Sequence, residues 1–326
     1  MSGRENTKEG RVVALCGGVG GAKLAFGLSR LLGDRLMLIV NTGDDFEHLG
    51  LSISPDIDTV LYTLSGLANR ELGWGRRDES WNFIAALEAI GGETWFRLGD
   101  RDLALHVERT RRLRAGEPLT EIVADFAIRF GISAQILPMC DDPIRTIVAT
   151  PEGKLPFQRY FVEQRCAPRV TGIAFEGRHE ARTSEKVLAA LEAPDVRAVI
   201  VCPSNPFLSI DPILAVPGIR ERMEKAAAPV IAVSPIIGGK AVKGPTSKIM
   251  AELDMPATSE TILRHYEGLL DGLVIDRADA AESRALPGAV HVTDTLMKTD
   301  EDRVRLAGEV LAFADRLGAK AMDGGR

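Results

Sequence analysis

The stretch that decides the fold is "RVVALCGGVGGAKLAFGLSRLL", residues 11–32. Its first six residues are a short apolar run rich in β-branched side chains, which is typical of a buried strand. From residue 22 onward the apolar residues follow helical spacing, and four glycines separate the two patterns. A strand, a glycine turn and a helix in this order are the first unit of a parallel α/β sheet.

The same alternation continues along the chain. Further strands are predicted at "LMLIV" (36–40), "VRAVIVC" (196–202), "PVIAVS" (229–234), "GLVID" (272–276) and "AVHVT" (289–293), with helices between them. We therefore predict an α/β fold with a Rossmann-like, mainly parallel sheet and helices on both faces. Three β-rich runs are expected in 134–176: "RTIVAT" (145–150), "FQRYFVE" (157–163) and "VTGIAFEG" (170–177).

The domain organisation follows from the same patterns. We expect one domain over 11–318, closed by a helix from about 300 to 317, with flexible ends at 1–10 and 319–326. A helical insert is predicted at about 67–132, where three amphipathic segments follow one another. The basic run "RTRRLR" (109–114) lies in one of these segments, and we interpret it as a solvated helix face.

Composition excludes several classes of protein. The net charge is −6, and 45% of the residues are hydrophobic, as expected of a soluble protein that does not bind nucleic acid. The cysteines are scattered, which disfavours a zinc site or a disulfide framework. The N-terminus has no apolar signal region, and no apolar run reaches the roughly 20 residues of a membrane span. We expect a cytoplasmic protein that does not enter a membrane.

The glycine turn "CGGVGGAKL" (16–24) is the first candidate site. Glycines at the start of a helix let a phosphate approach the backbone, so we predict phosphate binding by Gly17, Gly18, Gly20, Gly21 and Lys23. The dinucleotide fingerprint fails, because Lys23 replaces its third glycine and Asn41 stands where an acid is expected. The P-loop pattern fails too. The alternative is a tight turn without a ligand.

The acidic segment "VNTGDDFEHLGLSISPDIDT" (40–59) follows the second strand. Its aspartates at 44, 45, 56 and 58 predict a Mg²⁺ site or a group that accepts a proton. The alternative for Asp56 is capping of a helix that begins near Ile57, with Asp58 in its first turn. The two interpretations are compatible. His48, a lone loop histidine, is expected to be solvated.

Three later stretches also carry polar side chains. In "CPSNPFLSIDPIL" (202–214), Ser204 and Asn205 are candidates to hydrogen-bond a base or ribose, unless the stretch is only a proline-rich connection. "SPIIGGKAVKGPTSK" (234–248) offers Lys243 as a further phosphate contact. "GWGRRDESW" (73–81) offers Trp74 and Arg77 to a flat aromatic ligand, unless it only packs a helix start.

Seven stretches together resemble one family, the 2-phospho-L-lactate transferases of coenzyme F-420 biosynthesis. They are "LCGGVGGAKL", "VNTGDDFEHLGLSISPDIDTVLYTL", "GWGRRDESW", "LGDRDLALHVERTRRLRAGEPL", "LPMCDDPIRT", "CPSNPFLSIDPILAVPGIR" and "SPIIGGKAVKGP", in this order over roughly residues 11–300. The resemblance implies a Rossmann-like core with an added helical region, a homodimer and a requirement for Mg²⁺. It also implies transfer of a phosphorylated three-carbon acid (phospholactyl, phosphoenolpyruvyl or phosphoglyceryl) from a guanosine-diphosphate-linked donor to the terminal hydroxyl of the deazaflavin Fo, with release of GMP.

The resemblance also implies roles for the candidate residues. Residues 17–23, with Lys243, would hold the diphosphate, and Ser204 and Asn205 would meet the guanosine. Asp45 and Asp58 would be catalytic, and with Asp44 they would hold the metal. The acceptor Fo would be bordered by Asp44, Phe46, Asp56, Trp74 and Arg77.

Two other functions are open to this sequence. A nucleotide-sugar-binding regulator of the same superfamily, without transferase activity, would share the glycine turn. We would not expect it to have "GWGRRDESW" or "LGDRDLA". An NAD-dependent dehydrogenase is disfavoured by Lys23 and Asn41.

Overall fold

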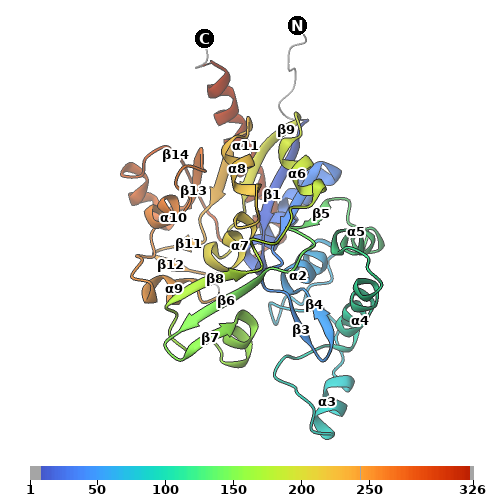
Figure 1. The fold of residues 1–326 in the computed structure, drawn as a ribbon. Helices are drawn as coiled ribbons and strands as arrows, with labels where there is room; N and C mark the ends of the chain where they lie inside the picture. The colour runs from blue at the N-terminus through green and yellow to red at the C-terminus, as the bar shows by residue number, and fades with distance from the viewer. Residues whose placement is uncertain (1–8, 243, 324–326) are drawn as a thin grey trace.

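The computed structural model describes residues 9–242 and 244–323. Seven parallel strands form the central sheet, in the order β14-β13-β10-β9-β1-β2-β5 (Figure 1). Their bounds are β1 (Arg11–Cys16), β2 (Leu36–Val40), β5 (Gln135–Pro138), β9 (Val196–Val201), β10 (Val230–Val233), β13 (Gly272–Asp276) and β14 (Ala289–Thr293). The predicted α/β class with a parallel sheet is confirmed.

Helices cover both faces of the sheet, because alternate residues of each strand supply two separate cores. Val12 and Ala14 pack in one core with α1 (Gly18–Leu32), α2 (Pro55–Leu64), α5 (Leu119–Arg129) and α11 (Asp300–Asp323). Val13 and Leu15 pack in the other. The helices of that second core are α6 (Glu185–Glu192), α7 (Asp211–Leu214), α8 (Ile219–Glu224), α9 (Thr246–Glu252) and α10 (Ser259–His265).

Helices α3 (Asn82–Ala89) and α4 (Asp100–Arg114) come between α2 and α5, in the region predicted as a helical insert. Figure 1 shows α3 and α4 extending away from the central sheet, with α4 beside the hairpin of β3 (Phe46–His48) and β4 (Leu51–Ile53). This antiparallel hairpin lies inside the acidic segment, and the sequence patterns did not reveal it. It brings the acidic segment into contact with the insert.

A small antiparallel sheet, β7-β6-β8, packs below the central one (Figure 1). It consists of β6 (Arg145–Thr150), β7 (Gly153–Pro156) and β8 (Gly172–Glu176). The remaining elements are the hairpin β11 (Ile236–Ile237)–β12 (Lys240–Ala241) and the short helices η1 (Gly33–Arg35), η2 (Arg159–Glu163), η3 (Pro206–Ile210) and η4 (Arg277–Arg284).

Three expectations about local structure were wrong. The run "FQRYFVE" is helical over Arg159–Glu163, because Phe157 and Tyr160 bury on the same side at a helical spacing of three. The last helix continues to Asp323, past the end expected near 317. Helix α2 begins at Pro55 with Ser54 as its N-cap, so Asp56 lies inside its first turn and does not cap it.

Some predictions fall on residues outside the part that the structure describes: those for Lys243 and for the chain ends at 1–8 and 324–326. Among the helices of residues 9–242 and 244–323, none combines the length and the apolar character that a membrane crossing requires.

Candidate active site

Three loops meet at the carboxyl edge of the central sheet, where open α/β sheets bind their ligands. They follow β1, β2 and β9, and hydrogen bonds join them. The Ser204 hydroxyl accepts a bond from the Gly17 N–H (3.1 Å) and donates one to the Gly17 carbonyl (2.7 Å). The Asn41 amide donates to Asp56 (2.9 Å) and to the Leu208 carbonyl (3.2 Å). The glycine turn, the acidic segment and the 202–214 loop therefore form one site.

The glycines of the turn are required by this close packing. A Cβ atom on Gly17 would lie 2.6 Å from an Asp56 carboxylate oxygen, and one on Gly20 would lie 2.5 Å from the Pro203 carbonyl. A Cβ on Gly21 would overlap the Ser204 hydroxyl. Contacts within the protein thus account for these three glycines, as the alternative of a tight turn without a ligand requires. Phosphate binding at the turn stays a prediction.

Asp56 occupies the N-terminus of α1. Its carboxylate accepts hydrogen bonds from the Asn41 side chain and the Gly18 N–H, at the positive end of the helix dipole. Burial is the stronger influence and raises the pKa of Asp56 to about 6. The Asp56 carboxylate therefore occupies the N-terminus of α1, where a bound phosphate was predicted.

The neighbouring pair, Asp44 and Asp45, is buried, with exposed fractions of 7% and 9%. One Asp45 oxygen accepts a bond from the Ser54 hydroxyl (2.7 Å). Within the described residues, Oδ1 of each aspartate has no hydrogen-bond partner. Burial raises the pKa of Asp45 to about 7, and burial with the nearby Asp56 charge raises the pKa of Asp44 well above its usual value. Two buried carboxylates with an unused oxygen each are suited to a divalent cation.

Asp58 is paired differently. Both of its oxygens accept hydrogen bonds from the Arg109 guanidinium of α4, one of them at 3.1 Å. Arg109 is fully buried, so the interpretation of the 109–114 run as a solvated face was wrong at this residue. Asp58, Asp102 and His106 lie close enough together to hold a metal, but the Arg109 charge already neutralises Asp58. Both carboxylate oxygens of Asp58 are thus already bonded to Arg109.

The sequence analysis assigned no role to Asp102, His106 or Arg109. His106 lies 3.6 Å from Asp58 through Nδ1 and 3.3 Å from Asp102 through Nε2. The signal was present, because residues 102, 106 and 109 are spaced four and three apart and so share one face of a helix. The sequence did not show that this face of α4 packs on the acidic segment.

Aromatic side chains gather against the β3–β4 hairpin. The Phe46 ring lies 4.9 Å from Phe96 and 5.9 Å from Trp95, and the His48 ring lies 5.0 Å from Trp95. The Arg159 guanidinium lies 4.4 Å from the centre of the Trp95 ring. His48 is buried, so its expected solvation was wrong. Trp95 and Phe96 were not predicted as site residues.

Trp74 and Lys23 share a different environment. Trp74 is 48% exposed, lies 6.4 Å from Trp81, and lines a cavity of about 130 Å³ together with Lys23. The Lys23 ammonium donates to the Met297 carbonyl (3.0 Å). Arg77 lies on the surface, 3.6 Å from Asp78. No ring contact joins Trp74 to Phe46 among the described aromatic residues, so the structure does not bring these two acceptor candidates together.

Asn205 has one used and one unused side-chain atom. Its oxygen accepts bonds from the N–H groups of Phe207 (3.0 Å) and Leu208 (3.1 Å), which caps η3. Its buried amide nitrogen has no partner within the portion of the chain that is described. The loop is therefore a structural connection, as one alternative held, and it also contains a buried hydrogen-bond donor that is unused within the described residues.

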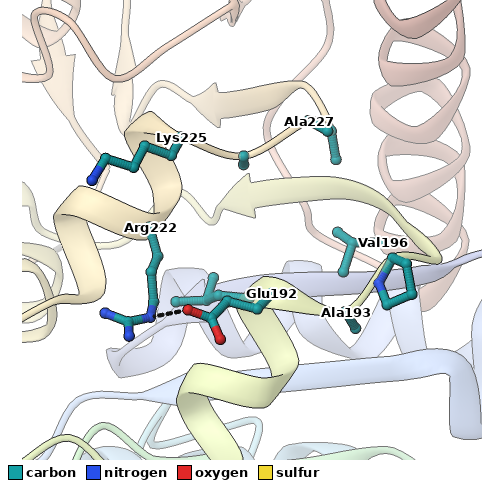
Figure 2. Close-up of a pocket in the computed structure, with 10 residues that line it drawn as sticks. Glu192, Ala193, Val196, Arg222, Lys225 and Ala227 are labelled. Carbon is teal, nitrogen blue, oxygen red and sulfur yellow. Dashed lines mark hydrogen bonds and ion pairs between the residues drawn. The ribbon is translucent and has the colours of Figure 1, made fainter.

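A cavity of about 320 Å³ lies elsewhere, between α6, α8 and the amino ends of β9 and β10 (Figure 2). Arg222 and Glu192 point toward one another across it and form an ion pair of 2.6 Å. This cavity is at the wrong edge of the sheet for a substrate of such a fold. The unpartnered buried atoms of Asp44, Asp45 and Asn205 lie at the carboxyl edge, so we place the active site there.

Comparison with known proteins identifies the family of this chain. The family model described as 2-phospho-L-lactate transferase CofD matches residues 12–312. A phosphoenolpyruvate transferase of Streptomyces griseus is 40% identical over 95% of this chain and 100% of its own length. A 2-phospho-L-lactate transferase of Methanosarcina acetivorans is 39% identical over 93% of this chain and 99% of its own.

The fold is shared with a solved structure of low sequence similarity. A protein of the UPF0052 family from Bacillus halodurans superposes with a TM-score of 0.62, at 14% identity, over 93% of this chain and 99% of its own. That likeness supports the architecture alone. The match over nearly the whole chain to the family model, and the identity to full-length relatives, decide the assignment: the chain belongs to the 2-phospho-L-lactate transferase CofD family.

Proposed function

We propose that this protein transfers a phosphorylated three-carbon acid from a guanosine-diphosphate-linked donor to the terminal hydroxyl of the deazaflavin Fo, in coenzyme F-420 biosynthesis. The hydroxyl oxygen bonds to the phosphorus that carries the acid, the bond from that phosphorus to GMP breaks, and the hydroxyl proton is released. The observation that carries this proposal is the buried Asp44–Asp45 pair with its unused oxygens, in a chain 39% and 40% identical to full-length transferases.

The identity of the acid is not decided by the relatives. Those named phosphoenolpyruvate transferase and those named 2-phospho-L-lactate transferase are about equally similar to this chain, at 40% and 39% identity. We therefore propose the class, a phospholactyl, phosphoenolpyruvyl or phosphoglyceryl group, and leave the choice to the assay below.

We propose that Asp44 and Asp45 hold Mg²⁺. When bound, the ion would neutralise charge on the donor phosphates. The fit rests on two buried carboxylates whose Oδ1 atoms have no partner in the described residues. We assign Asp58 a positioning role, since its oxygens are taken by Arg109.

We propose that Phe46 and the adjacent Trp95 border the flat ring of Fo. Phe46 begins the hairpin that directly follows Asp45, and Trp95 lies against it, so a stacked acceptor would have its ribityl chain near the carboxylates. Catalysis would then consist mainly of holding the two substrates in line and balancing phosphate charge. From the family resemblance we also propose a cytoplasmic homodimer, and light scattering of the purified protein would test its oligomeric state.

A product assay tests the proposed function. Purified protein is mixed with Mg²⁺, Fo and each of the three guanosine-linked donors, and products are identified by mass spectrometry. GMP together with the matching Fo phosphodiester is the expected result, and the preferred donor identifies the acid. Binding of a nucleotide sugar without any GMP release would instead favour the regulatory alternative.

Mg²⁺ should stabilise the protein more at about pH 8 than at about pH 5.5, because metal ligands must be deprotonated. In the folded protein the pKa values of Asp45 and Asp56 are about 7 and about 6, above the usual value of an unfolded aspartate. The folded protein therefore binds more protons than the unfolded chain does. Without metal, their contribution to stability is therefore present below about pH 4 and is lost as the pH rises through about 7. Melting temperatures with and without Mg²⁺ measure both effects. A Mg²⁺ shift of equal size at both pH values would contradict the assignment.

Asn205→Asp should weaken guanosine-nucleotide binding by about tenfold or more, the cost of one lost hydrogen bond and one added charge. The substituted side chain keeps an oxygen that can cap η3, so the fold is expected to persist. It replaces only the unpartnered nitrogen. Calorimetry with GDP measures the affinity, and Gln135→Glu, the same change from amide to carboxylate at the exposed start of β5, is the control. Unchanged GDP affinity in Asn205→Asp would remove this residue from the nucleotide site.

A further inference from the structure

Arg145 stands at the start of β6, next to the acidic segment. The N–H of the following residue, Thr146, donates to the Gly43 carbonyl (2.7 Å). A Cβ atom on Gly43 would lie 2.8 Å from the Thr146 hydroxyl, so the two segments are in close contact. This contact places the start of β6, and with it the backbone of Arg145, beside the turn that carries Asp44 and Asp45.

The Arg145 guanidinium has no acidic partner among the described residues. Its one hydrogen bond goes to the carbonyl of Ile144 (3.0 Å), and no carboxylate in the described ranges lies within the 4.0 Å of an ion pair. Glu176 is opposite Arg145 in the β6–β8 register, but it pairs with Lys154 (3.5 Å). The five donor groups of this arginine are thus largely unused.

Its charge nevertheless reaches the site. The Arg145 guanidinium interacts electrostatically with the Asp45 carboxylate, more strongly than Arg109 does. Arg109, the other arginine that acts on Asp45, is fully buried and has both arms on Asp58. Arg145 is half-buried, so it is the arginine of the two that a substrate can contact.

Unused polar atoms lie on the same segments. The Thr42 hydroxyl is buried without a partner in the described part of the chain, as are Oδ1 of Asp44 and of Asp45, and the Thr146 side chain lies beside Asp44. Acceptor oxygens and a cation with open donors, on adjoining segments, are a combination that a phosphate with a bound divalent ion would satisfy.

We propose that Arg145 is a catalytic residue that binds the phosphoryl group under transfer through its guanidinium. This rests on the proposed function. The planar guanidinium can donate two parallel hydrogen bonds to phosphate oxygens, so it stabilises the charge of the transition state without entering the covalent chemistry.

The test uses Arg145→Gln, Arg145→Lys and Arg145→Ala in the full chain, with Glu176→Gln as the matched control on the opposite strand. We expect kcat to fall roughly 10²–10³-fold in Arg145→Gln at an unchanged melting temperature. We expect only partial activity in Arg145→Lys, since an ammonium is a point charge. Free guanidinium should restore part of the rate of Arg145→Ala, and Glu176→Gln should behave as wild type.

The outcomes separate the two proposals. If the wild-type protein forms no GMP with any of the three donors, the proposed function fails. If the wild type is active and Arg145→Gln stays within about threefold of it, a change too small for a lost phosphoryl contact, the role of Arg145 is overturned. The role of Arg145 is also overturned if Arg145→Gln is both slow and less stable than the wild type, and free guanidinium does not restore activity to Arg145→Ala. Those results would show a structural role.

Discussion

Asp45→Asn lowers the rate of transfer by about 10²–10³-fold or more, the size expected when charge stabilisation at the reacting phosphate is lost. The amide is nearly isosteric and still offers an oxygen to the Ser54 hydroxyl, so the local structure should persist. It cannot ionise, and a neutral amide is a poor ligand for Mg²⁺ in place of a carboxylate. Steady-state kinetics with the preferred donor measure the effect.

The same substitution should not destabilise the metal-free protein at about pH 8. In the wild type, burial raises the pKa of Asp45 to about 7, so ionisation of this residue costs folding free energy above that pH. Removing the charge removes the cost. Asp34→Asn, on the surface of η1, is the matched control and should change neither activity nor stability. Turnover near the wild-type rate in Asp45→Asn would exclude Asp45 from the mechanism.

Arg109→Met should lower the free energy of unfolding by about 3–5 kcal/mol, the range measured when one partner of a buried ion pair is removed. Arg109 is fully buried against Asp58, and the substitution leaves that carboxylate buried without its cation. Urea denaturation followed by circular dichroism measures the change. Activity should fall as well, because Asp58 and the acidic segment lose their support.

Two variants make this prediction specific. Arg111 lies on the same helix and forms an exposed ion pair with Glu108, so Arg111→Met should lower the free energy of unfolding far less than Arg109→Met does. In the double variant Asp58→Leu/Arg109→Met neither charge of the buried pair is left alone, so most of the lost stability should return. A double variant that is less stable than Arg109→Met would show that the pair is not the main cause.

The insert supports the active site through α4. Besides Arg109, the Thr110 hydroxyl accepts the Ser52 N–H (2.8 Å), and the Arg114 guanidinium donates to the Gly50 carbonyl (2.7 Å). These bonds hold the β3–β4 hairpin, and with it Phe46 and the neighbouring Asp45. Substitutions on the inner face of α4 should therefore reduce activity although none of these residues touches the reacting atoms.

The sequence alone determined the architecture and the edge of the sheet that carries the site. Strand and helix patterns are local, and their alternation before residue 67 and after residue 176 is regular enough that a parallel sheet was the expected arrangement, although β5 was not among the predicted strands. The polar stretches after β1, β2 and β9 had to meet, because parallel strands end at the same edge. The aspartates of the acidic segment could be chosen as candidates for this reason.

What packs against each of these residues could be seen only in the three-dimensional fold. Arg109 looks like any helix-surface arginine until α4 is packed over Asp58, and Gly20 looks like a ligand contact until Pro203 is seen against it. Lys23 and Trp74 meet across 51 residues of sequence, and Phe46 and Trp95 across 49. Desolvation, pairing and pKa depend on what covers a side chain in space, and residues distant in sequence provide that cover.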